Sequence, residues 1–345
     1  MSSDQTRRRF LTVTGTTSIA ALAGCTGGTD DSSGGDETES ESGDGSESGN
    51  ESESDGDSGG TANRLSWHAG GTGGTYFPLS NEFKTIVEAN SDFSLNVQST
   101  GASVENVGSL ADGSADFALI QNDIASFAKN GTGIDAFQDN AIDSLQGVAT
   151  LYPETITLVT LAENDISSIS DLSGATINTG DLGSGTQVNA QQILDSVGIS
   201  DYNEQNAGFS QASEQLANGD IDAAFVVGGW PVGAIEDLAN TNDIEIVPIG
   251  GDNREAAKSD ASWFADDTIP GGTYSGVDED VETVAVQAMI ATHSGVDADT
   301  VETVTAAIFD NLGELSIKTD FISADSAQDG MSIELNEGAA AYFDA

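Results

Sequence analysis

Four glycine-rich corners of the chain combine backbone and hydroxyl donors in a way that suits an anion. In each corner an apolar run ends, a turn rich in small residues follows, and a helical pattern begins. The first N–H groups of a helix lack partners within it and carry partial positive charge, so together they can hold a carboxylate. Glycine lets a ligand approach the backbone closely. The corners span residues 70–75, 100–103, 180–186 and 228–231.

These corners supply most of the residues that we expect to bind a ligand. Any single corner could serve only to cap its helix, since Thr75, Ser103 and Thr186 are good N-cap residues. Four corners spread over two halves of the chain favour a shared site instead. The predicted ligand-binding residues of the corners are Gly73, Gly74, Thr75, Thr100, Ser103, Gly183, Ser184, Gly185, Thr186, Gly229 and Trp230.

Side chains beside the corners add a second chemistry. Gln121 and Asp123, at the end of a predicted strand, supply an acceptor and a counter-charge for a ligand amine. Asp123 is equally suited to cap the helix that follows. Tyr152 and Trp230 would form apolar walls of the site, or would pack in the core without any function.

Arginine and the residues of enzyme sites are scarce. Only Arg64 and Arg254 follow the N-terminal region, and neither lies in a corner, so amides and hydroxyls would hold a ligand carboxylate. The dinucleotide pattern that starts at Gly71 lacks its last glycine. A serine triad or a zinc site needs histidine, and the chain has only His68 and His293. We therefore predict a binding protein without cofactor or metal, with an α/β enzyme as the less favoured alternative.

The elements that must position these residues alternate between strands and helices. Short apolar runs predict strands, and glycine-rich turns join them to longer helical stretches. Repeats of this unit predict an α/β fold whose parallel sheets are covered by helices on both faces, with ligands beyond the carboxyl ends of the strands. The predicted strands are 65–69, 95–99, 117–121, 148–161, 175–179, 223–227 and 244–249, and the predicted helices include 76–89, 103–111 and 186–197.

One extended segment is long enough to connect two lobes. Residues 148–161 are strongly apolar and β-prone, and we expect a break in them at 152–154. We assign residues 62–150 to the first part of lobe 1 and residues 151–250 to lobe 2. Residues 251–345 are expected to form a mainly helical return to lobe 1.

The charge of the chain is strongly one-sided. Its 345 residues carry 58 Asp and Glu against nine Lys and Arg, for a formal net charge of −49. Residues 62–345 alone hold 45 acidic and six basic residues, so an acidic tail does not account for the imbalance. Such a surface repels nucleic acid and anionic lipid, which excludes both as partners. Self-repulsion weakens in molar salt, where the Debye length is roughly 3 Å, so the composition predicts a protein of a very salty medium.

The N-terminus resembles an export and anchoring signal. Arg7 and Arg8, followed by Phe-Leu at positions 10 and 11, resemble a twin-arginine signal. The single cysteine, Cys25, ends a Leu-Ala-Gly-Cys lipobox-like motif. We interpret residues 1–24 as a signal peptide, and residues 25–61 as a lipidated cysteine with a disordered acidic linker. This places the domain at the extracellular face of the membrane, held by a lipid anchor alone.

The domain resembles the solute receptors of tripartite ATP-independent (TRAP) transporters, in their TAXI branch. Six segments occur in order and carry the resemblance, which covers nearly all of residues 64–345. They are residues 71–76, 103–106, 116–123, 151–154, 183–186 and 272–277. Tyr76 and Asn106, which lie in two of these segments, complete the predicted ligand-binding set.

The resemblance implies a two-lobed, type II periplasmic-binding-protein fold with a ligand cleft between the lobes. Members are associated with small carboxylates and amino acids such as glutamate, which they deliver to ion-driven membrane transporter subunits. The family's His-Pro-Gly-Ala near the C-terminus reads Asn-Glu-Gly-Ala at 336–339, which removes any role that depends on that histidine. A binding lipoprotein of an ABC importer would share the fold and the cleft, so it stays as the alternative.

Overall fold

The computed structural model describes residues 63–345. The predictions for Arg7, Arg8, Cys25 and the acidic linker lie outside these residues. Within residues 63–345, no helix combines the length and the apolar character needed to cross a membrane.

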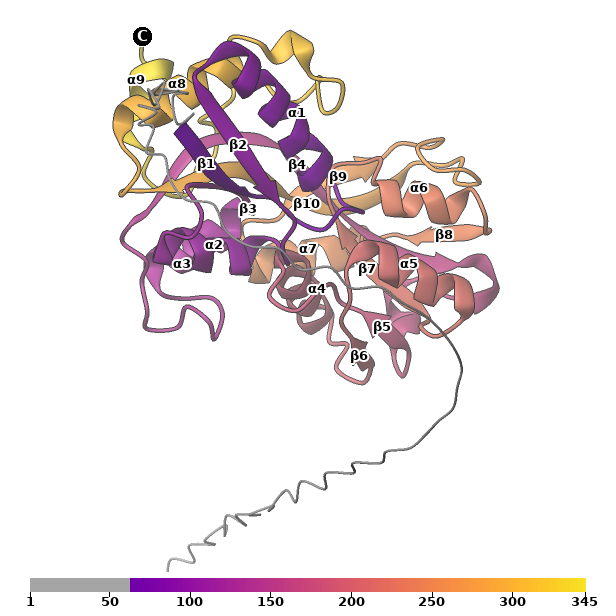
Figure 1. Ribbon diagram of the computed structural model, residues 1–345. Coiled ribbons are helices and arrows are strands. Elements are labelled where there is room, and N and C mark those ends of the chain that lie inside the picture. The colour runs from indigo at the N-terminus through magenta and orange to yellow at the C-terminus, as the bar shows by residue number, and fades with distance from the viewer. Residues whose placement is uncertain (1–62) are drawn as a thin grey trace, which may run out of the picture. The chain divides into compact units, whose positions relative to one another are not determined.

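Lobe 1 starts with three β-α units (Figure 1). Strand β1 pairs in parallel with β2 on one side and with β3 on the other. The predicted strands at 65–69, 95–99 and 117–121 and the helices at 76–89 and 103–111 are confirmed to within two residues at each end. The elements are β1 (Asn63–His68), α1 (Tyr76–Asn90), β2 (Phe93–Gln98), α2 (Ser103–Asp112), β3 (Phe117–Gln121) and α3 (Asn122–Asn130).

Lobe 2 repeats the same local pattern. Strand β5 lies between β6 and β7 and runs parallel to both. Its elements are β5 (Thr176–Asn178), α4 (Gly185–Ser196), β6 (Asn203–Gln205), α5 (Phe209–Asn218), β7 (Ala223–Val227), α6 (Gly233–Ala239), β8 (Ile244–Val247) and α7 (Gly251–Asp260).

Two long antiparallel strands connect the lobes. Strand β4 (Leu145–Leu161) pairs with β10 (Val281–His293) through its first part and with β7 and β8 through its last part. The resulting strand order is β2-β1-β3-β10-β4-β7-β5-β6. Each lobe therefore has its own sheet region, and both crossover strands take part in both lobes.

The predicted break at 152–154 is wrong, because β4 runs through it without interruption. The ladder to β10 instead shifts register between Gln287 and Met289, opposite residues 150–153. Proline cannot donate to a ladder and is tolerated at such irregular positions, so Pro153 fits inside the strand.

The segment after residue 250 is less helical than predicted. It contributes β9 (Ala265–Ile269), which pairs with β10, as well as β10 itself. Only its last part returns to lobe 1 as helices, α8 (Ala298–Phe309) and α9 (Glu337–Phe343). Figure 1 shows these two helices beside α1 at the C-terminal end of the chain.

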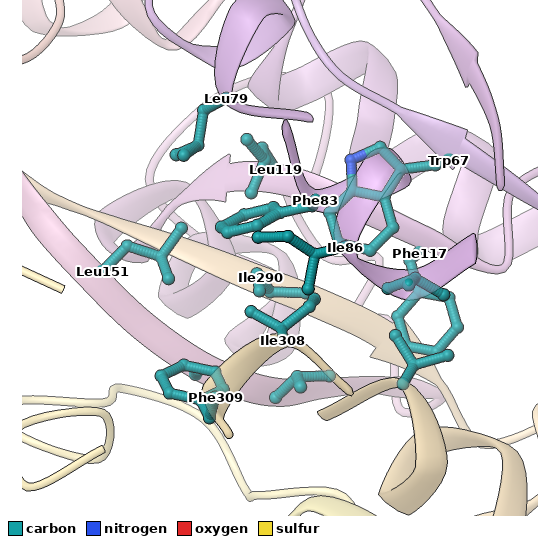
Figure 2. Packing of buried hydrophobic residues seen from close by; sticks show 14 of the residues in the cluster. Trp67, Leu79, Phe83, Ile86, Phe117, Leu119, Leu151, Ile290, Ile308 and Phe309 are labelled. Atoms are coloured by element: carbon teal, nitrogen blue, oxygen red, sulfur yellow. The ribbon is translucent and has the colours of Figure 1, made fainter. Parts of the chain in front are cut away.

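Helices cover both faces of the sheet in each lobe, as predicted. In β3, Phe117 and Leu119 belong to the apolar cluster with α1 and α8, whereas Ala118 and Ile120 belong to the cluster with α2 and α3. Figure 2 shows the first of these clusters, in which Trp67 stacks on Phe117 with ring centroids 5.6 Å apart. Burial on two faces explains why these strands read as continuous apolar runs.

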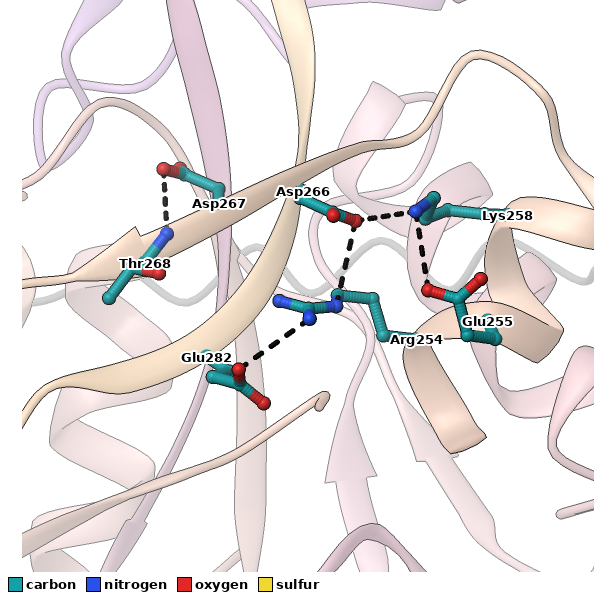
Figure 3. Close-up of polar contacts among 7 residues, drawn as sticks. All are labelled: Arg254, Glu255, Lys258, Asp266, Asp267, Thr268 and Glu282. Carbon is teal, nitrogen blue, oxygen red and sulfur yellow. Dashed lines mark hydrogen bonds and ion pairs between the residues drawn. The ribbon is translucent and has the colours of Figure 1, made fainter. Parts of the chain in front are cut away.

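Arg254 and Lys258, the basic residues of lobe 2, belong to an ion-pair cluster (Figure 3). Arg254 on α7 lies 3.5 Å from Asp266 on β9 and 3.5 Å from Glu282 on β10. Lys258 lies 2.6 Å from the same Asp266. Arg254 thus links a helix to two strands, which leaves it no part in the glycine corners.

Candidate functional site

A cavity of about 60 Å³ lies where the two lobes meet. Small-molecule sites occur preferentially at such junctions between domains. Lobe 1 and the crossover strand β4 contribute Gly70, Gly71, Gly74, Thr75, Tyr76, Thr100, Gly101, Ala102, Ser103, Gln121 and Glu154. Lobe 2 contributes Asp181, Ser184, Gly185, Thr186, Gly208, Phe209 and Val227.

Three of the four predicted corners meet at this cavity, namely residues 70–75, 100–103 and 180–186. They are brought together because each follows the carboxyl end of a strand, and the two sheets present those ends to each other. The predicted residues that line the cavity are Gly74, Thr75, Tyr76, Thr100, Ser103, Gln121, Ser184, Gly185 and Thr186.

The fourth corner, residues 228–231, does not line the cavity. Only Val227, the last residue of the strand before it, does so. The carbonyl oxygen of Gly229 accepts hydrogen bonds from Thr75 Oγ1 at 3.3 Å and from Lys318 Nζ at 2.5 Å. Tyr152 is buried behind this corner and, like Gly229 and Trp230, does not line the cavity. We refer to residues 228–231 as the β7–α6 corner.

Four other predicted residues also lie off the cavity. Asn106 is buried and donates to the carbonyl oxygens of Ala69 at 2.6 Å and Leu119 at 2.8 Å, which ties α2 to two strand ends. Asp123 accepts a hydrogen bond of 2.9 Å from Asn189 of lobe 2. Asp123, the second residue of α3, therefore contributes to the contact between the lobes.

The remaining two, Gly73 and Gly183, contribute carbonyl groups that bond across the lobes. The Gly73 carbonyl accepts from the Ala234 N–H at 3.1 Å. The Gly183 carbonyl accepts from the Val104 and Glu105 N–H groups at 3.2 and 3.3 Å. The first amides of α2 are thus occupied by lobe 2 and are not free for a ligand.

Capping, the alternative reading of the corners, applies to one hydroxyl of the cavity. Ser184 is the N-cap of α4, and its Oγ accepts from the Gln187 N–H at 3.1 Å. Thr75 precedes α1 without a side-chain cap bond, and Ser103 Oγ accepts from the Gln121 N–H at 3.1 Å. Of these three hydroxyl residues, only Ser184 therefore caps a helix.

Two helix starts from opposite lobes face this cavity. Helix α1 begins at Tyr76 in lobe 1 and helix α4 begins at Gly185 in lobe 2, and both residues line the cavity. A Cβ atom on Gly185 would overlap the end of the Gln121 side chain, which would have to move. The positive ends of both helices can converge on one anionic group.

Glu154 is a cavity residue that we did not predict. It is 3% exposed, and Tyr76 Oη donates to its Oε2 at 2.8 Å. Burial raises the pKa of Glu154 to about 8, against the lowering effect of hydrogen bonds from Tyr76 and Gln121. A single carboxylate inside an apolar strand of 17 residues was the sequence signal for it.

Acceptors, not cations, dominate the side chains of the cavity. Its lining contains Glu154 and Asp181 but no Lys, Arg or His. Gln121 is 2% exposed, and its Oε1 has no hydrogen-bond partner within the described part of the chain. Among residues 63–345, no group of three or more His, Cys, Asp or Glu side chains is arranged to hold a metal.

The fold and the cavity define a class of protein. Two α/β lobes joined by crossover strands, with a cavity between them, form a two-lobed periplasmic-binding-protein-like fold. The model of the NMT1-like family matches residues 68–344. The chain belongs to the NMT1-like family.

Solved structures resemble this chain at low sequence identity. The substrate-binding protein of an amino acid ABC transporter is 14% identical, with a TM-score of 0.45 over 74% of this chain and 96% of that one. The alkanesulfonate-binding protein SsuA from Xanthomonas axonopodis pv. citri, bound to MOPS, is 15% identical, with a TM-score of 0.44 over 74% and 77%. A substrate-binding protein of an ABC uptake transporter from Streptococcus pneumoniae, with bound histidine, is 14% identical, with a TM-score of 0.42 over 71% and 85%.

Proposed function

We propose that the protein is an extracellular receptor that captures a small amino acid and delivers it to a membrane transporter. The observation that carries this proposal is the pairing of two opposed helix starts with a cationless, acceptor-rich wall in one cavity. A zwitterion fits both halves of this arrangement. A dianionic ligand without an amine fits only one half.

The carboxylate of the ligand would lie between the starts of α1 and α4. The N–H groups there are free of helical partners, and Ser184 and Thr186 add hydroxyl donors. Backbone amides and hydroxyls suffice to hold an anion at helix starts. An arginine fork is not needed, in agreement with the engagement of Arg254 elsewhere.

The ammonium group of the ligand would face Glu154 and Gln121. The sequence also predicts Asp123 for this role, but in the structure Asp123 accepts a hydrogen bond from Asn189. Glu154 lines the cavity, and an approaching cation would favour its ionised form. The free Oε1 of Gln121 supplies a neutral acceptor beside it.

A TRAP transporter of the TAXI type is the partner that we propose, on the strength of the six ordered sequence segments described above. The fold and cavity would serve an ABC importer equally well, which makes that the second candidate. Uptake by membrane vesicles that hold the purified receptor separates the two. A requirement for an ion gradient supports the TRAP assignment, and a requirement for ATP contradicts it.

We further propose that the twin-arginine signal exports the protein and that Cys25 carries the lipid anchor. The position of Cys25 before an acidic, apolar-poor tract supports this proposal. Mass spectrometry of the membrane fraction would detect the lipid on Cys25. A Cys25→Ser protein that stays with the membrane would contradict the anchor.

Ligand binding is tested first by thermal unfolding in molar salt with L-glutamate, other amino acids and dicarboxylates. A ligand at one hundred times its Kd adds about 2.7 kcal/mol to the free energy of unfolding, which is a visible shift in Tm. Amino acids should stabilise the protein more than dicarboxylates that lack an amine. A set in which no amino acid shifts the Tm would contradict the proposal.

The position of the site is tested by Ser184→Ala. Removing a hydrogen bond to a charged group costs about 1.5–3 kcal/mol, so the Kd should rise about tenfold or more. Asn336→Ala is the matched control, because Asn336 also caps a helix, α9, through a hydrogen bond to Gly338 N–H. The control should lower the Tm without changing the Kd. Unchanged affinity in Ser184→Ala would place the carboxylate elsewhere.

A further inference from the structure

Lys318 lies at the contact between the lobes, unlike the other basic residues of the described chain. Arg254 and Lys258 are held in the ion-pair cluster of lobe 2. Lys84 pairs with Glu88 on α1, and Lys129 donates to two carbonyl groups of lobe 1. Lys318 is the basic residue of this set whose partners belong to the opposite lobe.

The segment that carries Lys318, residues 316–321, is fixed to lobe 1. The Ser316 N–H donates to Glu82 Oε2 of α1 at 2.9 Å. Ile317 and Ile322, on either side of Lys318, pack into the apolar cluster of lobe 1. The backbone of this segment therefore moves with lobe 1.

The amine of Lys318 reaches the β7–α6 corner of lobe 2. Its Nζ donates to the carbonyl oxygens of Gly229 at 2.5 Å and Trp230 at 2.7 Å. Phe321 adds an edge-to-face contact with the Trp230 ring, with centroids 5.9 Å apart. A Cβ atom on Gly229 would lie 2.9 Å from Lys318 Cε and 2.9 Å from Tyr152 Cδ2, so glycine is needed for this approach.

Burial makes this contact dependent on the position of the lobes. Desolvation in the contact lowers the pKa of Lys318 to about 8. The two carbonyl groups replace that water with charge-assisted hydrogen bonds. Both bonds would be lost together if the β7–α6 corner moved away.

We propose that Lys318 is a positioning residue that sets ligand affinity by holding the β7–α6 corner of lobe 2 against lobe 1. It does not line the cavity and so acts without touching the ligand. Thr75, which does line the cavity, donates to the same Gly229 carbonyl. The contact therefore fixes lobe 2 at the side of the cavity where α1 begins. This proposal rests on the proposed ligand-binding function.

The affinity effect follows from the population of the closed arrangement. When only a fraction of the protein has the lobes together, the apparent Kd rises by the inverse of that fraction. Losing two charge-assisted hydrogen bonds is sufficient to lower this population, and we expect the Kd to rise about tenfold.

The test compares Lys318→Met with Lys129→Met, in the full chain with L-glutamate as the probe. Lys129 is the matched control because it also donates to two carbonyl groups, at 2.8 and 3.1 Å, but within lobe 1. Lys318→Met should raise the Kd about tenfold and lengthen the distance between spin labels on the two lobes. Lys129→Met should change neither quantity. The labels would replace Glu88 and Asp220 in a Cys25→Ser background.

A second variant perturbs the same contact from lobe 2. Gly229→Ala should lengthen the label distance as Lys318→Met does. The double variant should lengthen it little further, since both substitutions remove the same contact. Wild-type distances in both single variants would overturn the proposal. If L-glutamate fails to bind the wild type, the ligand class is wrong, while the label distances still decide the role of Lys318.

Discussion

Replacing Glu154 with glutamine should change how the stability of the protein depends on pH. Glu154 is buried in the cavity wall, and its pKa is raised from 4.5 to about 8. The folded protein therefore keeps a proton that the unfolded chain has lost at neutral pH. Because the folded state binds more protons in this window, the free energy of unfolding falls as pH rises from 4.5 to about 8.

The size of the effect follows from that interval. Each pH unit lowers the free energy of unfolding by about 1.4 kcal/mol while only the folded state holds the proton. Across the whole interval, Glu154 can lower the free energy of unfolding by up to about 5 kcal/mol. Glutamine stays neutral and can still accept the hydrogen bond from Tyr76, so Glu154→Gln should lack this loss. The pKa of Asp123 is raised to about 6 by burial, but Asp123 is present in both proteins.

The assay is urea unfolding in molar KCl, followed by tryptophan fluorescence at several pH values between about 5 and 8. Glu154→Gln should become more stable than the wild type as the pH rises. Glu214→Gln, which removes an exposed carboxylate of α5, is the control and should track the wild type. Parallel curves for the wild type and Glu154→Gln would refute the assignment of Glu154 as a buried neutral acid.

Two further predictions concern the cavity and the charge. Gly185→Ala should abolish measurable ligand binding, because the added methyl group overlaps Gln121. Gly198→Ala, past the end of α4, is the control and should lower only the stability of the protein. Calorimetric titration with L-glutamate checks both variants. The Tm should rise with KCl from about 0.1 to 3 M, because 45 carboxylates repel one another over residues 62–345, and a Tm independent of salt would contradict this.

The regular elements were the predictable part of the fold. Residues 117–121 and 223–227 are predicted as strands with the bounds that the structure shows, because both begin with at least four consecutive apolar residues. Strand β10 was missed. Gln287, Ala288 and Met289 suit a helix as well as a strand, and the pairing of β10 with β3 and β4 makes the choice.

The site was predictable in its chemistry and only partly in its members. Glycine and hydroxyl residues at strand ends identified three corners of the cavity, because the carboxyl ends of parallel strands lie at one edge of each sheet. The fourth corner has the same local pattern, yet Lys318, 89 residues further along the chain, contacts it from the other lobe. No local pattern contains that contact.

What the sequence determined by itself was the α/β class, the glycine corners and the absence of arginine from them, since these depend on residue type and short spacing. The tertiary structure decided which carboxylate faces the cavity. Asp123 and Glu154 are both buried acids, but a lobe–lobe hydrogen bond holds the first and the cavity receives the second. That choice depends on how two sheets, joined by β4 and β10, are set against each other, which is a property of long-range packing.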